Sequence, residues 1–416
     1  MRHIIYITFF LSIFSFIDLG ILESPQILIQ HPLIIVSLIY CIYKYKNLPI
    51  DIITIYFVLF VIGSFNVVLG NNSWGLLFKI SIGLIANTLF FYYLIKHECF
   101  NTYRIFKAYM YGALASSIIV IIQIISYGFG FRYGYDVELI GIRLSIEDGE
   151  ILPASLFTEP SHYASVLSPA IFISIYNIIS LKKHFVNLLS SAIILLSTIL
   201  IYSSTGYIAI LLSLILIAVN YRKIKVLISV LCIGIICFYL LYNNVSKFKV
   251  RVDDSKSVFF DNKVKLGQNK EYNASTMVLY NNMIIAFKNF SQHPIFGTGL
   301  GSHIYAHDKY TIFKDDVWWV NLNKEDANSL FLRIISELGL IGIFFTFYFI
   351  NKFRISKEKS NNDTNWLINN AILVLFIVNL LRQGNYMIYG FTCFVLLYYF
   401  SSKQNNSKLT ENLFFE

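Results

Sequence analysis

The sequence predicts an all-α integral membrane protein with about twelve transmembrane helices, and three observations lead to that fold class. The 416 residues are 56% hydrophobic and only 14% charged, with a mean hydropathy of +0.62. A soluble chain carries about 25% charged residues. The apolar residues gather into long runs, and about 20 apolar residues in a helix cross the hydrocarbon core of a bilayer. Basic residues cluster in alternate connections between these runs.

The twelve predicted spans follow one another in chain order. They lie near residues 4–22, 27–43, 52–69, 74–95, 105–127, 153–179, 185–202, 206–221, 224–243, 328–350, 366–382 and 385–400. The first run lacks a small-residue cleavage site after it, so it is interpreted as an uncleaved helix. The stretch from Phe185 to Tyr221 has no charge and would be roughly 55 Å long as one helix. We therefore expect a tight turn at 203–206 between two spans.

The positions of the basic residues predict the orientation of the chain. Lys and Arg recur around residues 44–46, 96–107, 182–183, 222–225, 352–359 and 403–408, whereas the short connections 23–26, 70–74 and 203–206 have none. Cytoplasmic loops of membrane proteins are enriched in Lys and Arg. Both termini, including the polar tail 401–416, are therefore predicted to be cytoplasmic. Once located in this way, the net charge of +9 does not indicate a nucleic-acid partner.

Two predicted outer loops are long. One covers residues 128–152 within the first nine spans (1–243), and the other covers residues 244–327, before the last three spans (328–400). The second is the only stretch large enough for a small external domain. It contains apolar residues at helical spacing, namely Met277, Tyr280, Met283, Ile284, Phe287 and Phe290. This stripe predicts either an amphipathic helix on the membrane or a core helix of a small domain.

The start of the sixth span holds an ionisable pair, Glu159 and His162, within residues 157–164. Charged residues at a membrane boundary are costly and are often functional. The plainer alternative is a helix start, with Pro160 in the first turn and Glu159 facing the positive end of the helix dipole. We retain Glu159 as a candidate catalytic residue and His162 as a candidate substrate ligand.

Several arginines are candidates for binding an anion. Arg143 lies in the outer loop before Glu159, and Arg382 ends the eleventh span. A guanidinium group suits bidentate binding of phosphate or carboxylate. The alternative for each is a surface arginine that meets lipid headgroups or a local acid. Arg333 and Glu337 lie one helical turn apart, so they form an intrahelical pair or leave Glu337 facing an external cavity.

Glycines flank two further candidates. Gly339 and Gly342 follow Glu337 and are expected to allow close helix packing. His303 and His307 follow the glycine-rich run 297–301. Two histidines four residues apart in a helix are suited to zinc, but no third ligand is evident, and we predict no metal. The glycine run follows no clear strand, so a turn that brings backbone close to a ligand is preferred to a nucleotide fold.

On these motifs the chain resembles the O-antigen polymerase family, which is related to the O-antigen ligase superfamily. The matching pieces are Arg143 before 157–161, the turn 204–206, the segment 293–301, and Asn328 followed by 337–342. The resemblance covers about residues 70–400. The chain departs from the family pattern at Ser275 and Thr276, where an arginine is frequent and Arg251 is the nearest one here. It departs again at Ala327, where a His-Asn pair is frequent.

The resemblance implies an inverting, metal-independent glycosyltransferase in the bacterial plasma (inner) membrane, without a cofactor. Such an enzyme moves a growing glycan from undecaprenyl pyrophosphate to a new lipid-linked repeat unit. It implies membrane lipid and a chain-length regulator protein as partners. Outer-face arginines would stabilise the departing pyrophosphate, and a carboxylate would serve the acceptor hydroxyl as base. The candidate catalytic residues are Arg143, Glu159 and Glu337. The candidate substrate ligands are Arg251, Arg333, Arg382, His162, His303 and His307.

Two other functions are compatible with the sequence. A ligase would transfer finished polysaccharide to another acceptor and would share the fold and the arginines. A flippase for lipid-linked sugars also has about twelve spans, but it needs charged residues in a central cavity and no large outer loop. The stretch 244–327 therefore favours an enzyme over a flippase or a purely structural partner protein.

Overall fold

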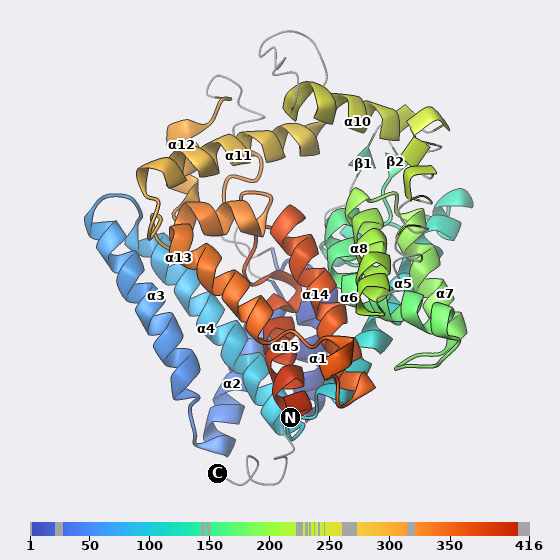
Figure 1. The fold of residues 1–416 in the computed structure, drawn as a ribbon, viewed down its shortest axis with the longest axis horizontal. Helices are drawn as coiled ribbons and strands as arrows, with labels where there is room; N and C mark the ends of the chain where they lie inside the picture. Colours follow the sequence, from blue (N-terminus) through green and yellow to red (C-terminus); the bar gives the residue numbers. More distant parts are fainter. Residues whose placement is uncertain are drawn as a thin grey trace.

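The computed structural model describes residues 2–20, 28–142, 146–147, 150–221, 228, 232, 234–236, 238–239, 242–244, 246–259, 273–313 and 321–406. This part of the chain folds into a helical bundle with one small antiparallel hairpin, β1 (Ile146–Glu147) and β2 (Glu150–Ile151) (Figure 1). The predicted all-α class therefore holds, apart from this hairpin in the 128–152 loop. The same loop contains the 3-10 turns η1 (Arg132–Gly134) and η2 (Val137–Ile140).

Six helices of the described residues are long and apolar enough to cross a membrane. They are α3 (Ile50–Val68), α4 (Trp74–His97), α5 (Thr102–Gly128), α6 (Pro160–Ser180), α13 (Leu330–Lys352) and α14 (Asp363–Arg382). The shorter helices of the bundle are α1 (Arg2–Phe14), α2 (Gln30–Tyr45), α7 (Leu188–Leu200), α8 (Ser204–Asn220) and α15 (Phe391–Asn406). The chain is thus built as a multi-pass membrane protein. The count of twelve stays a prediction, since 224–243 lies mostly outside the described residues.

The core of the bundle lies around α6 and α14. Of the apolar window of each helix, 83% and 78% respectively is buried, against 11% for α3 at the periphery. The α6 helix packs against α7, α8 and α14. Its residues are buried on every side, as expected for a central membrane helix. The start of α6 and the end of α14 are therefore held rigidly beside each other.

Side-chain caps set the start of several helices. Ser73, Asn187 and Ser329 accept a hydrogen bond from the backbone N–H three residues later and so begin α4, α7 and α13. Such caps satisfy N–H groups that have no partner within the helix. The predicted break between two helices is confirmed, but the connection covers residues 201–203 rather than 203–206, because α7 ends at Leu200 and α8 begins at Ser204.

Three predicted boundaries were wrong. The first span was expected to reach residue 22, but α1 ends at Phe14. The sixth was expected from residue 153, but α6 begins at Pro160, because proline is suited to the first helical position. The twelfth was expected from residue 385, but Tyr389 and Gly390 have positive φ angles of 55° and 67°. That backbone conformation is not helical, so α15 begins only at Phe391.

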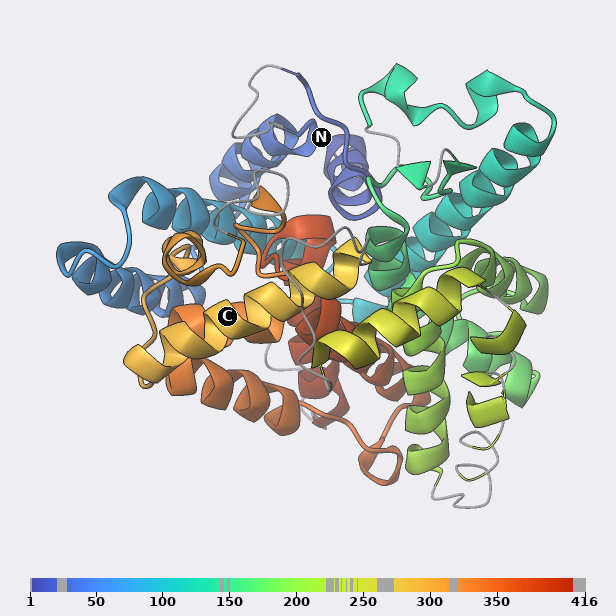
Figure 2. The same ribbon diagram turned by 90° about the horizontal axis from the view of Figure 1, so that it is seen from above.

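Three helices of the predicted external stretch cover one end of the bundle. They are α10 (Ser246–Phe259), α11 (Ala274–Gln292) and α12 (His303–Tyr310). Figures 1 and 2 show α10 and α11 lying across that end. We call the three helices α10, α11 and α12 the cap. The N-terminus and the C-terminal end of α15 lie at the opposite end (Figure 1). The connections α2–α3, α4–α5, α6–α7 and α13–α14, which hold the basic clusters, also lie there.

The helix predicted from the apolar stripe is confirmed as α11, and the stripe is buried in part. Met277 is 2% exposed, and Met283 and Phe290 pack against an apolar cluster that includes Leu332 and Ile335 of α13, whereas Phe287 keeps 47% of its surface exposed. The buried face also includes Asn281, Asn282 and Asn289, which face α12 and α13. The helix therefore joins the cap to the bundle through both apolar and polar side chains.

Candidate functional site

The α13 helix is interrupted at Gly339, whose φ and ψ angles of 60° and −150° are not helical. The N–H groups of the next two residues leave their own helix and donate to the loop formed by residues 293–301. The interruption and the loop exchange four backbone hydrogen bonds: Leu340 to Pro294 (2.8 Å), Ile341 to Ile295 (3.2 Å), Thr298 to Ser336 (3.3 Å) and Gly299 to Glu337 (2.8 Å). Backbone groups at membrane depth need such partners, because lipid offers none.

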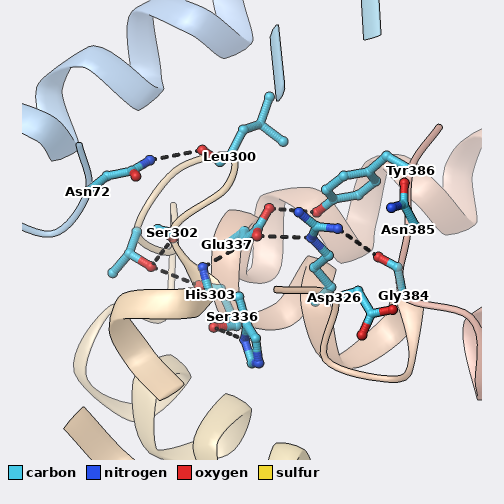
Figure 3. A network of polar contacts seen from close by, with 12 residues as sticks. Asn72, Leu300, Ser302, His303, Asp326, Ser336, Glu337, Gly384, Asn385 and Tyr386 are labelled. Atoms are coloured by element: carbon cyan, nitrogen blue, oxygen red, sulfur yellow. Dashed lines mark hydrogen bonds and ion pairs between the residues drawn. The ribbon is translucent and has the colours of Figure 1, made fainter. Parts of the chain in front are cut away.

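Two glycines make this contact possible. A Cβ atom on Gly339 would lie 2.6 Å from the Pro294 carbonyl oxygen, and one on Gly297 would collide with the Glu337 carbonyl. The expectation that Gly339 serves helix packing was therefore wrong: it opens the helix to the 293–301 loop. The glycine run brings its backbone close to α13. On its other side, the loop is held by Asn72, whose side chain donates to the Leu300 carbonyl at 2.8 Å (Figure 3).

The half-helix before the interruption carries a buried ion pair. Arg333 Nε lies 3.0 Å from Glu337 Oε1, and the two side chains are only 4% and 0% exposed. The second carboxylate oxygen accepts a hydrogen bond from Tyr386 Oη at 3.0 Å, and the backbone N–H of His303 points at Oε1 from 3.4 Å (Figure 3). The intrahelical pair allowed by the sequence is thus formed. Both oxygens of Glu337 are engaged, which suits orienting Arg333.

Arg333 is further held by the loop of residues 383–390, which connects α14 to α15. Its Nη1 donates to the Gly384 carbonyl at 3.0 Å, and its guanidinium carbon lies 4.4 Å from the Tyr386 ring centroid. A cation at this distance is attracted by the face of an aromatic ring. Asp326 also interacts electrostatically with Arg333. A buried arginine with this many partners has one fixed orientation.

An apolar cavity of about 330 Å³ lies beside this cluster. Its lining comes from α3, α4, α13, α14 and α15, and Tyr386 is part of it. One face of the half-helix, formed by Leu330, Ile334 and Leu338, lines the cavity. Arg333 and Glu337 lie on the same half-helix. A charged cluster and an apolar cavity therefore share Tyr386 and this half-helix. That combination fits an amphipathic ligand, with its hydrocarbon part in the cavity and its polar part beside the cluster.

A second polar cluster stands at the start of α6. Glu159 is the residue before the helix, is exposed, and accepts a hydrogen bond from Ser161 Oγ at 2.9 Å. His162 Nδ1 lies 2.8 Å from Thr158 Oγ1 and 3.0 Å from Tyr389 Oη. Glu159 thus sits at the positive end of the α6 dipole with its carboxylate open to solvent.

The 383–390 loop joins the two clusters. Gly384 contacts Arg333 near one end of the loop, and Tyr389 contacts His162 near the other. Asp326 interacts electrostatically with both Arg333 and His162. Residues that are far apart in the sequence therefore form one continuous polar site, at the cap-facing ends of α6 and α14.

The two histidines of α12 are part of the cap interior. His303 and His307 are both 0% exposed. Burial lowers the pKa of His303 to about 3 and that of His307 to about 4. Both rings are therefore neutral near pH 7. The His303 ring contacts Asn282 and Ser336, and His307 Nε2 lies 3.4 Å from Asn281 Nδ2. Among the described residues, no group of three possible metal ligands is present.

The other predicted arginines lie at different distances along the chain from the 383–390 loop, and one of them is not described. Arg143 lies outside the described residues. Arg251 belongs to α10 in the cap. Arg382 is half-buried at the end of α14, next to the 383–390 loop. Of the predicted site residues, Glu159, His162, Arg333, Glu337 and Arg382 thus gather around this loop.

Three residues of the site were not predicted from the sequence. Tyr386 and Asp326 contact or influence Arg333, and Tyr389 contacts His162. Only their positions in the sequence could have indicated them, since the two tyrosines follow Arg382 closely and Asp326 precedes α13. Neither tyrosine differs in its local pattern from the many other aromatic residues of the chain.

Comparison with known families bears on this arrangement. Residues 189–347 match the family model described as O-antigen ligase. The resemblance to that superfamily is thus confirmed over a stretch that includes α7, α8, the cap and most of α13. It contains Arg333, Glu337 and the 293–301 loop, but neither α6 nor the 383–390 loop. No curated protein matches the chain.

Proposed function

We propose that this protein is a polysaccharide polymerase of the O-antigen or capsule type. It transfers a growing glycan from undecaprenyl pyrophosphate to a new lipid-linked repeat unit. In this proposal the bundle has twelve spans in the bacterial inner membrane, both termini are cytoplasmic, and the cap lies on the outer side. The observation that carries the proposal is the buried Arg333–Glu337 cluster beside an apolar cavity of about 330 Å³.

The reaction needs three things from the protein. The acceptor hydroxyl attacks the anomeric carbon of the donor sugar, the bond from that carbon to the pyrophosphate oxygen breaks, and the hydroxyl proton passes to a base. Positive charge placed where the pyrophosphate departs stabilises the transition state. A base within reach of the hydroxyl assists the attack. Apolar surface beside the site accommodates the lipid carrier.

We assign these roles to the residues nominated by the sequence. Arg143 and Arg382 are proposed to bind the pyrophosphate, with Arg251 a weaker candidate. Glu159 is proposed as the base because its exposed carboxylate is open to an incoming hydroxyl. The position of Glu159 at a helix N-terminus favours its charged form, which is compatible with orienting an arginine instead. Glu337 is proposed to orient Arg333, since both of its oxygens are already bonded.

The proposal is tested by the glycan profile of a deletion strain, complemented with wild type, Arg143→Ala or Glu159→Gln. We expect a ladder that collapses to one repeat unit per lipid and is restored by wild type alone, at equal protein levels. Lys288→Ala, an exposed cation on α11, should restore it fully. Long polymer that stays on its carrier would indicate a ligase. A fully retained polymer in the deletion strain would exclude both enzymes and favour a transporter.

A further inference from the structure

A chain of buried hydrogen bonds connects the cap to the half-helix that carries Glu337. Its members come from α11 (Asn282, Asn289), from α12 (His303) and from α13 (Ser336). All four are at most 4% exposed. Buried polar groups of this kind are stabilising only when every member has a partner. The direction of each bond can therefore be worked out from its neighbours.

The amide of Asn282 fixes the proton on the imidazole ring. Its Nδ2 donates to the Val278 carbonyl at 3.0 Å, so its Oδ1 faces His303 Nε2 at 2.9 Å. Because Oδ1 can only accept, His303 Nε2 carries the proton and donates it. The remaining ring nitrogen, Nδ1, is then an acceptor. Its neutral state agrees with the low pKa that burial gives this ring.

The bond on the other side of the ring follows in the same way. His303 Nδ1 lies 3.2 Å from Ser336 Oγ and, as an acceptor, receives the hydroxyl proton. Asn289 Nδ2 donates its two protons among three acceptors, namely Ser336 Oγ and the Ser336 carbonyl at 3.0 Å and Thr298 Oγ1 at 2.9 Å. The chain therefore runs in one direction, from Asn289 through Ser336 and His303 to Asn282.

Ser336 lies where the backbone hydrogen bonds of α13 are interrupted. Its carbonyl has lost the usual helical donor, because the N–H of Leu340 goes to Pro294. The carbonyl is satisfied instead by Asn289 Nδ2 at 3.0 Å and by the Thr298 N–H at 3.3 Å. Glu337 is the next residue. Its orientation therefore depends on contacts from the cap as well as on its own helix.

We propose that His303 is a positioning residue: through Ser336 and its own backbone N–H, it fixes the half-helix so that the Glu337 carboxylate stays directed at Arg333 and Tyr386. The cap is thereby part of the machinery that shapes the site rather than only a cover. The assignment uses the proposed glycosyl transfer only as its activity readout. The state of the ring can be observed without it.

Two conservative substitutions distinguish a positioning role of His303 from a purely steric role. The amide of His303→Asn falls near the place of Nδ1 and can still accept from Ser336. The amide of His303→Gln reaches the place of Nε2 and keeps Asn282 while losing Ser336. We expect His303→Asn to retain most polymer synthesis in the complementation assay. We expect His303→Gln to lose roughly 10- to 100-fold, as is typical in metalloenzymes when a residue that orients a metal ligand is changed.

The matched control is Thr311→Ala. Thr311 is buried next to the end of α12, and its hydroxyl accepts a hydrogen bond from Asn281 of α11 at 3.1 Å. It should leave polymer synthesis near the wild-type level. Equal yields from the two His303 variants, whether both normal or both reduced, would overturn the proposal. If the deletion strain itself still made full-length polymer, the proposed function would fail instead, independently of His303.

An independent readout is the ¹⁵N spectrum of the histidine rings in purified, labelled protein, with His303→Asn identifying the signal. We expect the neutral form protonated at Nε2, unchanged between pH 8 and pH 5. A ring that titrates in this range, or that carries its proton at Nδ1, would contradict the hydrogen-bond chain.

Discussion

Arg333 and Glu337 are the residues on which most contacts of the site depend. Bringing two charges into an apolar bundle is costly, and the attraction between them offsets this only when the remaining polar atoms are bonded too. Here both carboxylate oxygens have partners, and the guanidinium also reaches the Gly384 carbonyl and the Tyr386 ring. The pair is therefore expected to hold together the half-helix of α13 and the 383–390 loop.

Removing one charge of the Arg333–Glu337 pair should lower the free energy of unfolding more than removing both charges. Glu337→Gln leaves a buried cation without its counter-charge, so we expect a loss of about 3–5 kcal/mol in the free energy of unfolding. In the double variant Arg333→Met with Glu337→Leu no charge stays buried, and most of that stability should return. Unfolding of the purified proteins in detergent, followed by tryptophan fluorescence, measures both. If the double variant lost as much stability as the single variants Arg333→Met and Glu337→Leu added together, the pair would not be coupled in this way.

At the scale of elements, the interruption of α13 organises the site. A continuous helix from Leu330 to Lys352 would use its own backbone bonds and leave the 293–301 loop without partners. The interruption gives those bonds to the loop, and the loop in turn connects α13 to α12 and to the turn before α4. The cap, the half-helix and the α3–α4 end are thus joined through one segment.

The glycine at the interruption should tolerate no side chain. Gly339→Ala would place a Cβ atom 2.6 Å from the Pro294 carbonyl oxygen, on a residue with a φ of 60°. Strain of this kind costs about 1–3 kcal/mol, before the clash is added. We expect a lower melting temperature and loss of polymer in the complementation assay. Gly75→Ala is the matched control, since nothing lies within 4 Å of its Cβ. A Gly339→Ala protein as stable and active as this control would show that the interruption is dispensable.

Local sequence patterns predicted the elements better than the joints between them. The apolar runs located most helices of the bundle, and helical spacing located α11. The interruption was missed because two glycines three residues apart in an apolar run are also typical of close helix packing. The polar part of the buried face of α11 was missed because asparagines do not resemble a core. Their burial depends on His303, Ser336 and Thr298, which come from other elements.

At the scale of the whole molecule, the site forms where distant segments meet. Tyr389 and His162 are 227 positions apart, yet their side chains lie within hydrogen-bonding distance at 3.0 Å. The sequence could nominate Glu159, His162 and Arg333 by chemistry, because charged groups beside apolar runs are unusual. It could not show that the 383–390 loop would bring them together, since that depends on how α6, α13 and α14 pack.

The fold also predicts which end of the molecule faces outward. The cap lies at one end, while the N-terminus, the end of α15 and the basic connections lie at the other (Figure 1). Positive charge favours the cytoplasmic side, so the cap and the polar site should be outside.

In a variant without native cysteines, Ser275→Cys on α11 and Lys359→Cys between α13 and α14 are both exposed. We expect a membrane-impermeant maleimide to label only the first in spheroplasts, and both after lysis. Labelling of Lys359→Cys alone before lysis would invert the topology. The lipid-linked donor would then have to be used on the cytoplasmic side, which contradicts the proposed polymerase.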